Sequence, residues 1–267
     1  MTTALKHGLH AIDHAFEIAR SQKRAAFMPY FPVGYPDYAT SLDVIQTLAN
    51  AGADVIEIGI PFSDPVADGP TIQAASQIAL QNGTSLSHCI QAVSELRERG
   101  VTIPLVFMGY FNPFMAYGLE KLITDVKSAG VDGFIVPDLP ADEADNFQPL
   151  IDAAQLSIAH FLAPTSSPDR IRLTAEKARG FIYLASLTGI TGSNALLPQN
   201  LVKKIAEIRL VTSIPIGVGF GIKTPDHARE VGKIADGIFV GTALVKAGGE
   251  SVQAAHTLAQ ALRNALD

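Results

Sequence analysis

The sequence predicts an α/β protein, a single (β/α)8 TIM barrel with an extra N-terminal helix. Strand patterns alternate with helical patterns along the whole chain, and the strand patterns number eight. No Gly-x-Gly-x-x-Gly turn follows the first of them, which disfavours the alternative, a doubly wound open sheet. No linker or low-complexity segment interrupts the 267 residues, so we expect one domain over 1–267.

Each predicted strand is a short run rich in β-branched and aromatic residues, bounded by glycine, proline or polar residues. In order, these runs are 26–33, 54–60, 104–110, 132–138, 156–163, 180–186, 214–220 and 236–241.

The predicted helices repeat apolar residues at steps of three and four. Gly52 and Gly130 follow the last turns of two of them, where a glycine commonly ends a helix. The first helix precedes the first strand, so it should cap the N-terminal end of the barrel. The clearest helical patterns are 8–22, 40–52, 118–131 and 251–266.

Composition and charge exclude several classes of protein. The formal net charge is −6, and the densest basic spots are the pairs 23–24 and 203–204, so nucleic acid is not an expected ligand. No apolar run reaches the roughly 18 residues of a membrane span, and the N-terminus lacks the apolar core of a signal peptide. The only cysteine, Cys89, fits a reducing compartment, so we expect a cytoplasmic protein.

One strand pattern, DVIEIGI, carries Glu57 among its isoleucines. Side chains alternate across a strand, so the isoleucines should face the helices, while Glu57 and Gly59 point into the barrel. A buried glutamate with no cation in its strand should have a raised pKa and exchange a proton. The C-terminal end of a barrel strand is also where barrel active sites lie. The alternative is a structural glutamate paired with a buried Arg or Lys elsewhere.

The loop after that strand, PFSDPVADGP, adds two carboxylates between its prolines. Asp68 is a candidate partner of Glu57, because a desolvated and a wetter carboxylate in one pocket can divide acid and base roles. Its alternative is an ordinary Asp-Gly turn. We expect Asp64 to order the loop as an Asx-type turn and Pro70 to open the next helix.

Glycines at the ends of the last two strand patterns predict a phosphate site. The segment GVGFGIKTPDHA contains Gly219 and Gly221, and FVGTALV contains Gly241 and Thr242. Barrels often bind phosphate between these two loops through backbone N–H groups and a helix N-terminus, without requiring a lysine. Tight strand-to-helix turns would explain either glycine loop alone.

Two other parts of the sequence are a candidate lid and a candidate metal site. The segment after the sixth strand, SLTGITGSNALLPQN, is long and polar, which is typical of a lid, and Tyr183 in that strand either reaches the pocket or is a core tyrosine. The first helix carries His7, His10 and His14 on one face, but they lack a fourth ligand and lie at the wrong end of a barrel, so we expect no metal.

Several motifs, in order over essentially the whole chain, resemble the tryptophan synthase α chain family. They are MPYFPVGYPD, IEIGIPFSDPVADGPTIQ, MGYFNPF, VPDLP, GITG, GFGI and VGTALV. The resemblance implies a lyase that cleaves indole-3-glycerol phosphate into indole and glyceraldehyde 3-phosphate. It also implies a separate pyridoxal-phosphate β chain as partner in an αββα complex, with no cofactor in this chain.

The resemblance also assigns roles to residues. Glu57 corresponds to the acid/base that protonates indole C3 and removes the glycerol hydroxyl proton. Asp68 corresponds to the carboxylate that accepts from the indole N–H, and Tyr183 to a tyrosine near Glu57. The phosphate positions are Gly192, Gly221, Gly241 and Thr242, and the indole pocket holds Tyr30, Ile72, Met108 and Tyr110.

Three alternatives to the α subunit of a complex stay open on the sequence alone. They are a lyase that works without a partner, a catalytically weak subunit that activates a partner, and another barrel enzyme acting on a phosphosugar. The expected partner face is the apolar surface around the loops after the second and third strands.

Overall fold

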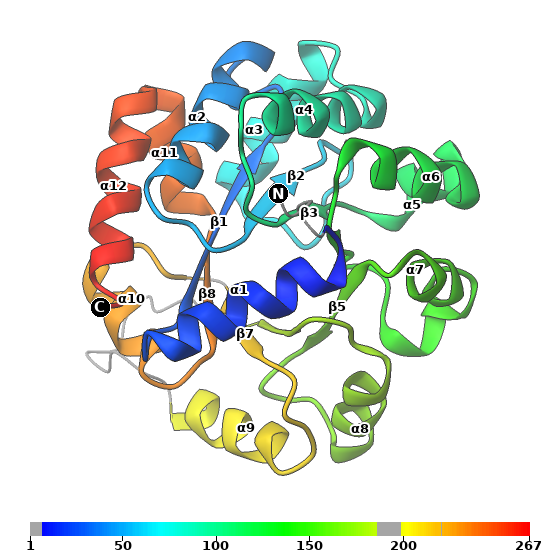
Figure 1. The fold of residues 1–267 in the computed structure, drawn as a ribbon, viewed down its shortest axis with the longest axis vertical. Coiled ribbons are helices and arrows are strands. Elements are labelled where there is room, and N and C mark those ends of the chain that lie inside the picture. The colour runs from blue at the N-terminus through cyan, green and yellow to red at the C-terminus, as the bar shows by residue number, and fades with distance from the viewer. Residues whose placement is uncertain (1–6, 186–198, 220) are drawn as a thin grey trace, which may run out of the picture.

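The computed structural model describes residues 7–185, 199–219 and 221–267, and it is a closed barrel (Figure 1). Neighbouring strands pair in parallel from β1 to β8, and β8 pairs with β1. The predicted (β/α)8 barrel is therefore confirmed, and the open sheet is excluded. The strands are β1 Ala26–Pro32, β2 Ile56–Gly59, β3 Leu105–Met108, β4 Gly133–Ile135, β5 Ser157–Leu162, β6 Ile182–Ala185, β7 Ile216–Gly219 and β8 Gly237–Val240.

The strands are shorter than the apolar runs that predicted them. Ile60 and Val136 lie just beyond β2 and β4 and are 5% and 1% exposed, so burial continues past the last paired residue. An apolar run indicates which residues are buried, whereas a strand ends where its pairing with the neighbouring strand ends. The apolar runs therefore overestimate the lengths of the strands.

Helices surround the barrel, and the four clearest predicted helices are correct to within two residues at each end. Gly52 and Gly130 have φ values of 93° and 87°, the left-handed conformation expected after a last turn. The described helices are α1 Leu9–Ser21, α2 Tyr38–Asn50, α3 Pro70–Gln81, α4 Leu86–Glu98, α5 Phe111–Tyr117, α6 Leu119–Ala129, η1 Ala141–Asn146, α7 Gln148–Ala154, α8 Pro168–Lys177, α9 Gln199–Arg209, α10 Pro225–Gly232, α11 Thr242–Glu250 and α12 Val252–Asn264.

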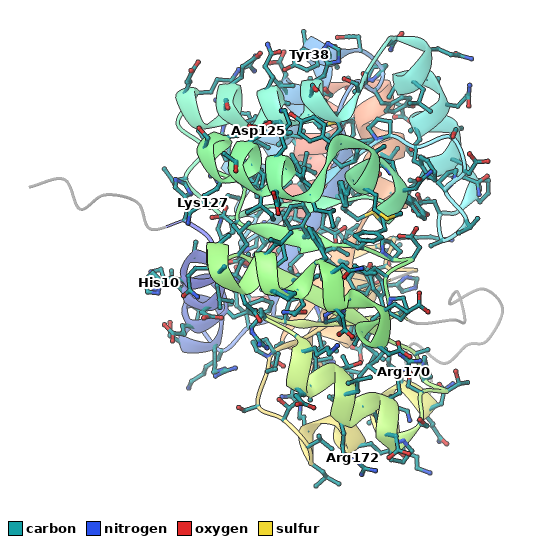
Figure 2. All side chains as sticks on the ribbon, turned by 90° about the vertical axis from the view of Figure 1, so that its right-hand side faces the viewer. His10, Tyr38, Asp125, Lys127, Arg170 and Arg172 are labelled. Carbon is teal, nitrogen blue, oxygen red and sulfur yellow. The ribbon has the colours of Figure 1, made fainter. Side chains whose placement is uncertain are left out.

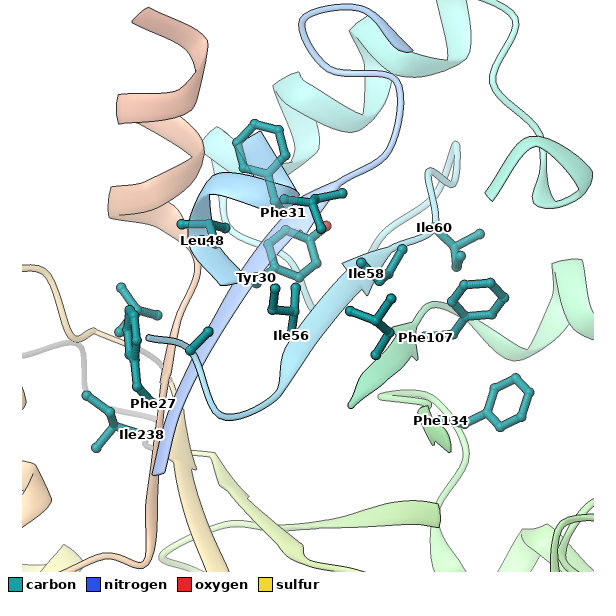
Figure 3. Close-up of a cluster of buried hydrophobic side chains, with 14 of the residues drawn as sticks. Phe27, Tyr30, Phe31, Leu48, Ile56, Ile58, Ile60, Phe107, Phe134 and Ile238 are labelled. Atoms are coloured by element: carbon teal, nitrogen blue, oxygen red, sulfur yellow. The ribbon is translucent and has the colours of Figure 1, made fainter. Parts of the chain in front are cut away.

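The alternation along β2 separates two layers of the core, as predicted. Ile56, Ile58 and Ile60 belong to the cluster between the strands and the helices (Figure 3). Val55 belongs to a second cluster inside the barrel, with side chains from the other strands. Because Glu57 lies two residues after Val55, its side chain extends from the same inward face.

Helix α1 closes the N-terminal end of the barrel, and it crosses the barrel opening in Figure 1. Its buried face includes Ile12, Phe16 and Ala19. The ring of Phe16 lies 5.7 Å from that of Phe181, inside the barrel. The predicted cap is thus confirmed, and it leaves the C-terminal end as the open one.

Charged side chains lie on the outer surface of the helical layer. Figure 2 shows this for Asp125 and Lys127 on α6 and for Arg170 and Arg172 on α8. Within the described ranges, no helix is long and apolar enough to cross a membrane. Carboxylates buried inside the barrel are therefore exceptions that require a reason.

Candidate active site

A cavity at the C-terminal end of the barrel gathers most of the predicted site residues. Gly192 falls outside the described residues, as does most of the predicted lid, and Tyr110 contacts the lining residue Asp68 without lining the cavity itself. The cavity is lined by Tyr30, Glu57, Asp68, Ile72, Met108, Tyr183, Gly221, Ile222, Lys223, Phe239, Gly241 and Thr242.

Glu57 points into this cavity from β2, where its neighbours in register are Tyr30 on β1 and Val106 on β3. The residue is 3% exposed. Its Oε1 has no hydrogen-bond partner among the residues that the structure describes. Burial, and secondarily the negative charge of Asp68, raise the pKa of Glu57 well above its ordinary value. The alternative of a glutamate paired with a buried cation finds no support there, since no described Lys or Arg pairs with it.

Asp68 lies in the loop between β2 and α3 and is only partly buried. The Tyr110 hydroxyl donates to its Oδ2 at 3.2 Å and accepts from the backbone N–H of Ala67 at 3.0 Å. Burial raises the pKa of Asp68 to about 6, and the hydrogen bond from Tyr110 opposes that rise. Tyr110 thus holds the carboxylate in position.

The same loop confirms one local prediction and corrects another. Pro70 is the first residue of α3, as expected. The predicted Asx-type turn at Asp64 is wrong, because its backbone oxygen accepts the Val66 N–H at 2.9 Å. The Asp64 carboxylate instead accepts from the Ser63 hydroxyl at 2.6 Å.

Aromatic rings form the wall between the two carboxylates and the barrel interior. Tyr183 is stacked between Phe161 and Phe239, with ring centroids 4.4 and 4.1 Å away. Burial, followed by the charge of Glu57, raises the pKa of Tyr183 well above its ordinary value, so the hydroxyl keeps its proton. Two strand glycines make room for the tyrosines: a Cβ at Gly219 would overlap Tyr183, and one at Gly59 would overlap Tyr30.

Residues of the β7–α10 and β8–α11 loops form another wall of the cavity. Gly221 has a φ of 98°, which disfavours any residue with a side chain. Thr224 caps α10 by accepting the His227 N–H at 3.3 Å, and Gly241 directly precedes α11. Two helix N-termini therefore begin beside this wall, and their dipoles favour an anion. In the first turn of α10, Pro225 has no N–H and the His227 N–H is taken by Thr224.

Three lining residues were missed from the sequence: Ile222, Lys223 and Phe239. Phe239 could have been found by the alternation that located Glu57, because it shares the inward face of its strand with Gly237 and Gly241. Lys223 gave no such signal, since a lysine before a helix start resembles any solvated residue.

The predicted placement of three histidines on the first helix is wrong for His7, which precedes α1 Leu9–Ser21. His7 Nδ1 lies 3.4 Å from Asp132 Oδ1, and the rings of His10 and His14 stack 6.4 Å apart. In the described part of the chain, no group of three or more His, Cys, Asp or Glu side chains is placed to hold a metal ion.

Comparison with known proteins assigns the family. Residues 16–266 match the family model described as tryptophan synthase alpha chain. The chain belongs to this family. It is 48% identical to the tryptophan synthase alpha chain of Chloroflexus aurantiacus over 88% of each chain. It is 46% identical to that of Dehalococcoides mccartyi, over 92% of this chain and 97% of the relative.

Solved structures share this fold, and one of them is a tryptophan synthase. A protein from Aquifex aeolicus has a TM-score of 0.90 and 40% identity, covering 96% of this chain and 98% of its own. Tryptophan synthase from M. tuberculosis has a TM-score of 0.88 and 33% identity, covering 96% of this chain and 99% of its own. As a member of the tryptophan synthase alpha chain family, the chain is a lyase of tryptophan biosynthesis that cleaves indole-3-glycerol phosphate into indole and glyceraldehyde 3-phosphate. Another phosphosugar enzyme is thereby excluded.

Proposed function

We propose that Glu57 and Asp68 carry this cleavage, with Glu57 moving the protons and Asp68 stabilising the indole ring. The observation that supports it is the buried Glu57 carboxyl, whose Oε1 is left unpartnered by the described residues in a cavity shared with Asp68. A carboxylic acid kept neutral by burial can deliver a proton at neutral pH.

The proposed reaction uses Glu57 twice. Its carboxylic acid first donates a proton to indole C3, which gives a cationic indolenine and a carboxylate. That carboxylate then accepts the proton of the hydroxyl on the adjacent glycerol carbon. The O–H electrons form the aldehyde C=O, and the electrons of the breaking C–C bond return to the ring. Indole and glyceraldehyde 3-phosphate leave, and Glu57 is again protonated.

Asp68 performs the complementary task in its ionised form. With a pKa of about 6, it is mostly ionised at neutral pH while Glu57, more deeply buried, holds its proton. The Asp68 carboxylate accepts from the indole N–H, where positive charge develops as C3 is protonated. Two carboxylates in different surroundings thus take different roles.

The rest of the cavity binds the two ends of the substrate. Tyr30, Ile72 and Met108 flank the indole ring, and Tyr110 acts through Asp68 as a positioning residue. The phosphate lies against the glycine loops, with Gly192, outside the described residues, as a further contact. The phosphate contacts that the cavity supports are Gly221, Gly241 and Thr242.

The chain acts as one domain with a β chain, in an αββα complex. Val66, in the loop after β2, and Met115, on α5 after β3, are large apolar residues that are 83% and 52% exposed. Both follow the C-terminal ends of neighbouring strands, where indole is released. Val66→Asp with Met115→Asp should weaken β-chain binding in a pull-down or calorimetric titration. Leu210→Asp, at an 89% exposed residue before β7, is the control. Unchanged binding in the double variant would contradict this face.

The test of the proposed function is indole release from indole-3-glycerol phosphate by the purified chain, with and without a β chain, beside Glu57→Gln. Activity that rises with the β chain and vanishes in the variant supports the α-subunit assignment. Equal and high activity without the β chain would favour a lyase that works alone. No indole under either condition would contradict the proposal.

A further inference from the structure

Of the described residues that line the active-site cavity, only Lys223 is a cation. It belongs to the loop between β7 and α10, on the same wall as Gly221, Gly241 and Thr242. The next residue, Thr224, is fixed by its capping bond to the His227 N–H, at 3.3 Å. Lys223 therefore extends from an anchored turn rather than from a free loop.

Among the described side chains, none neutralises the charge of Lys223. No carboxylate in the described ranges lies within ion-pair distance of its Nζ. The acidic residue closest in sequence, Asp226, pairs with Arg229 at 2.6 Å, and Lys233 pairs with Glu230 at 2.6 Å. Lys223 is thus a lysine at the mouth of a cavity with its charge available to a ligand.

The substrate creates a need for this charge. The cavity already contains the ionised carboxylate of Asp68, and the chain carries a formal net charge of −6, so an incoming phosphate dianion meets charge of its own sign. Helix N-termini provide only about half an elementary charge each. A full positive charge on the phosphate wall offsets the remaining repulsion.

We propose that Lys223 is a substrate-binding residue that pairs with the phosphate of indole-3-glycerol phosphate and thereby sets KM. The inference rests on the proposed placement of that phosphate between the two glycine loops. The phosphate keeps its charge throughout the reaction, so the pairing is equally strong in the ground state and the transition state. Such uniform binding lowers KM and leaves kcat unchanged.

The test compares Lys223→Met with Lys246→Met. Lys246 is an exposed lysine on the neighbouring helix α11 that does not line the cavity, so both variants lose one positive charge. At low ionic strength, Lys223→Met should raise KM and the inhibition constant of inorganic phosphate about tenfold, with kcat changed less than about twofold. Added salt should raise the KM of the wild type more than that of this variant. Lys246→Met should behave as wild type, and Lys223→Arg should restore most of the affinity.

Several results would overturn the role of Lys223. An unchanged KM in Lys223→Met, or the same rise in Lys246→Met, would contradict a direct contact. A parallel loss of affinity for indole, which carries no phosphate, would indicate a disturbed loop instead. If the wild-type chain cleaves no substrate, the proposed function fails separately. Equal binding of inorganic phosphate to wild type and Lys223→Met, measured by calorimetry, would still overturn the inference.

Discussion

Two carboxylates are buried at opposite ends of the barrel, and their surroundings differ. Asp132, just before β4 at the N-terminal end, is 0% exposed, and Glu57 is 3% exposed near the C-terminal end. Asp132 Oδ1 accepts the Gly8 N–H at 2.6 Å, and its Oδ2 accepts from Arg97 Nη2 at 2.6 Å and the Leu105 N–H at 2.8 Å. Glu57 Oε1 has no such partner among the described side chains and backbone groups.

Burial alone therefore does not tell what a carboxylate does. The guanidinium of Arg97 and the amide groups are partners for both oxygens of the Asp132 carboxylate, which joins the first helix to two strands. No described residue compensates the charge of Glu57 in this way, so burial favours its protonated form. One arrangement holds the fold together, and the other keeps a proton available for transfer.

Among the variants that test this comparison, Glu57→Gln should have the largest effect on activity. The amide cannot donate the proton to indole C3 or recover one from the hydroxyl, so indole release should fall by at least about 10³-fold. Thermal unfolding of the variant, measured alongside, should show a protein at least as stable as the wild type at neutral pH. Activity close to that of the wild type would contradict the role of Glu57.

The pH dependence of folding stability tests the same difference between the two carboxylates. The pKa of Glu57 is higher in the folded state than its ordinary value of 4.5, so the folded protein binds more protons than the unfolded chain. Stability contributed by this group is present below about pH 4.5 and is lost as the pH rises towards the folded-state pKa. Glu57→Gln should therefore become progressively more stable than the wild type as the pH rises, in urea titrations. An opposite trend would contradict the direction of the pKa shift.

Asp132→Ala should have the opposite combination of effects, a large loss of stability with little change in activity. It leaves Arg97, whose side chain is 13% exposed, without its carboxylate, which should lower the free energy of unfolding by about 3–5 kcal/mol. The kcat of the remaining folded protein should stay within about twofold of the wild type, because the change lies at the closed end. Asp43→Ala, which removes a surface pair with Arg99 at 2.8 Å, is the control and should leave the melting temperature nearly unchanged. Loss of kcat without loss of stability in Asp132→Ala would break the comparison.

Asp68→Asn should lower kcat/KM about 10²-fold, because the neutral amide stabilises the cationic ring less well. In the wild type, kcat/KM should fall as the pH drops through about 6, where Asp68 takes up its proton. The variant should lose that acidic limb. Because the charge of Asp68 contributes to the raised pKa of Glu57, the alkaline limb of the variant should move to lower pH. A pH profile identical to that of the wild type would contradict the coupling.

Gly219→Ala should have the smallest effect. Its methyl group would overlap the Tyr183 ring, and the shift should cost about 1–3 kcal/mol of stability and reduce activity. Gly69→Ala is the control for stability, since nothing lies within 4 Å of the added Cβ. Equal unfolding midpoints for the two variants would show that the Tyr183 ring moves aside without loss of stability.

Local periodicity was enough to predict the barrel and the inward direction of Glu57. The alternation of side chains is a property of each strand, and the strand–helix order of the chain determines how parallel strands can close. The predicted phosphate site at the glycines after β7 and β8 followed from topology, because a closed barrel places the C-terminal ends of these two strands side by side. These predictions needed no knowledge of any distant contact.

Contacts between distant residues could not be predicted. Tyr110 reaches Asp68 across 42 positions of sequence, and Asp132 reaches Gly8 across 124. In the sequence, Asp132 resembles any polar residue before a strand, and only its contacts with distant residues show that it is structural. Lys223 was likewise unremarkable in sequence, since its meaning comes from the cavity wall that it shares with Gly241.

The ionisation state of Glu57 tests the central claim most directly. Infrared spectra of protein labelled with ¹³C-glutamate, compared with Glu57→Gln, would identify the carboxyl signal of this one residue. At about pH 7, where ordinary glutamates are ionised, burial should keep the Glu57 signal in its protonated form. A Glu57 signal that titrates with the exposed glutamates, near the ordinary value of 4.5, would contradict the account.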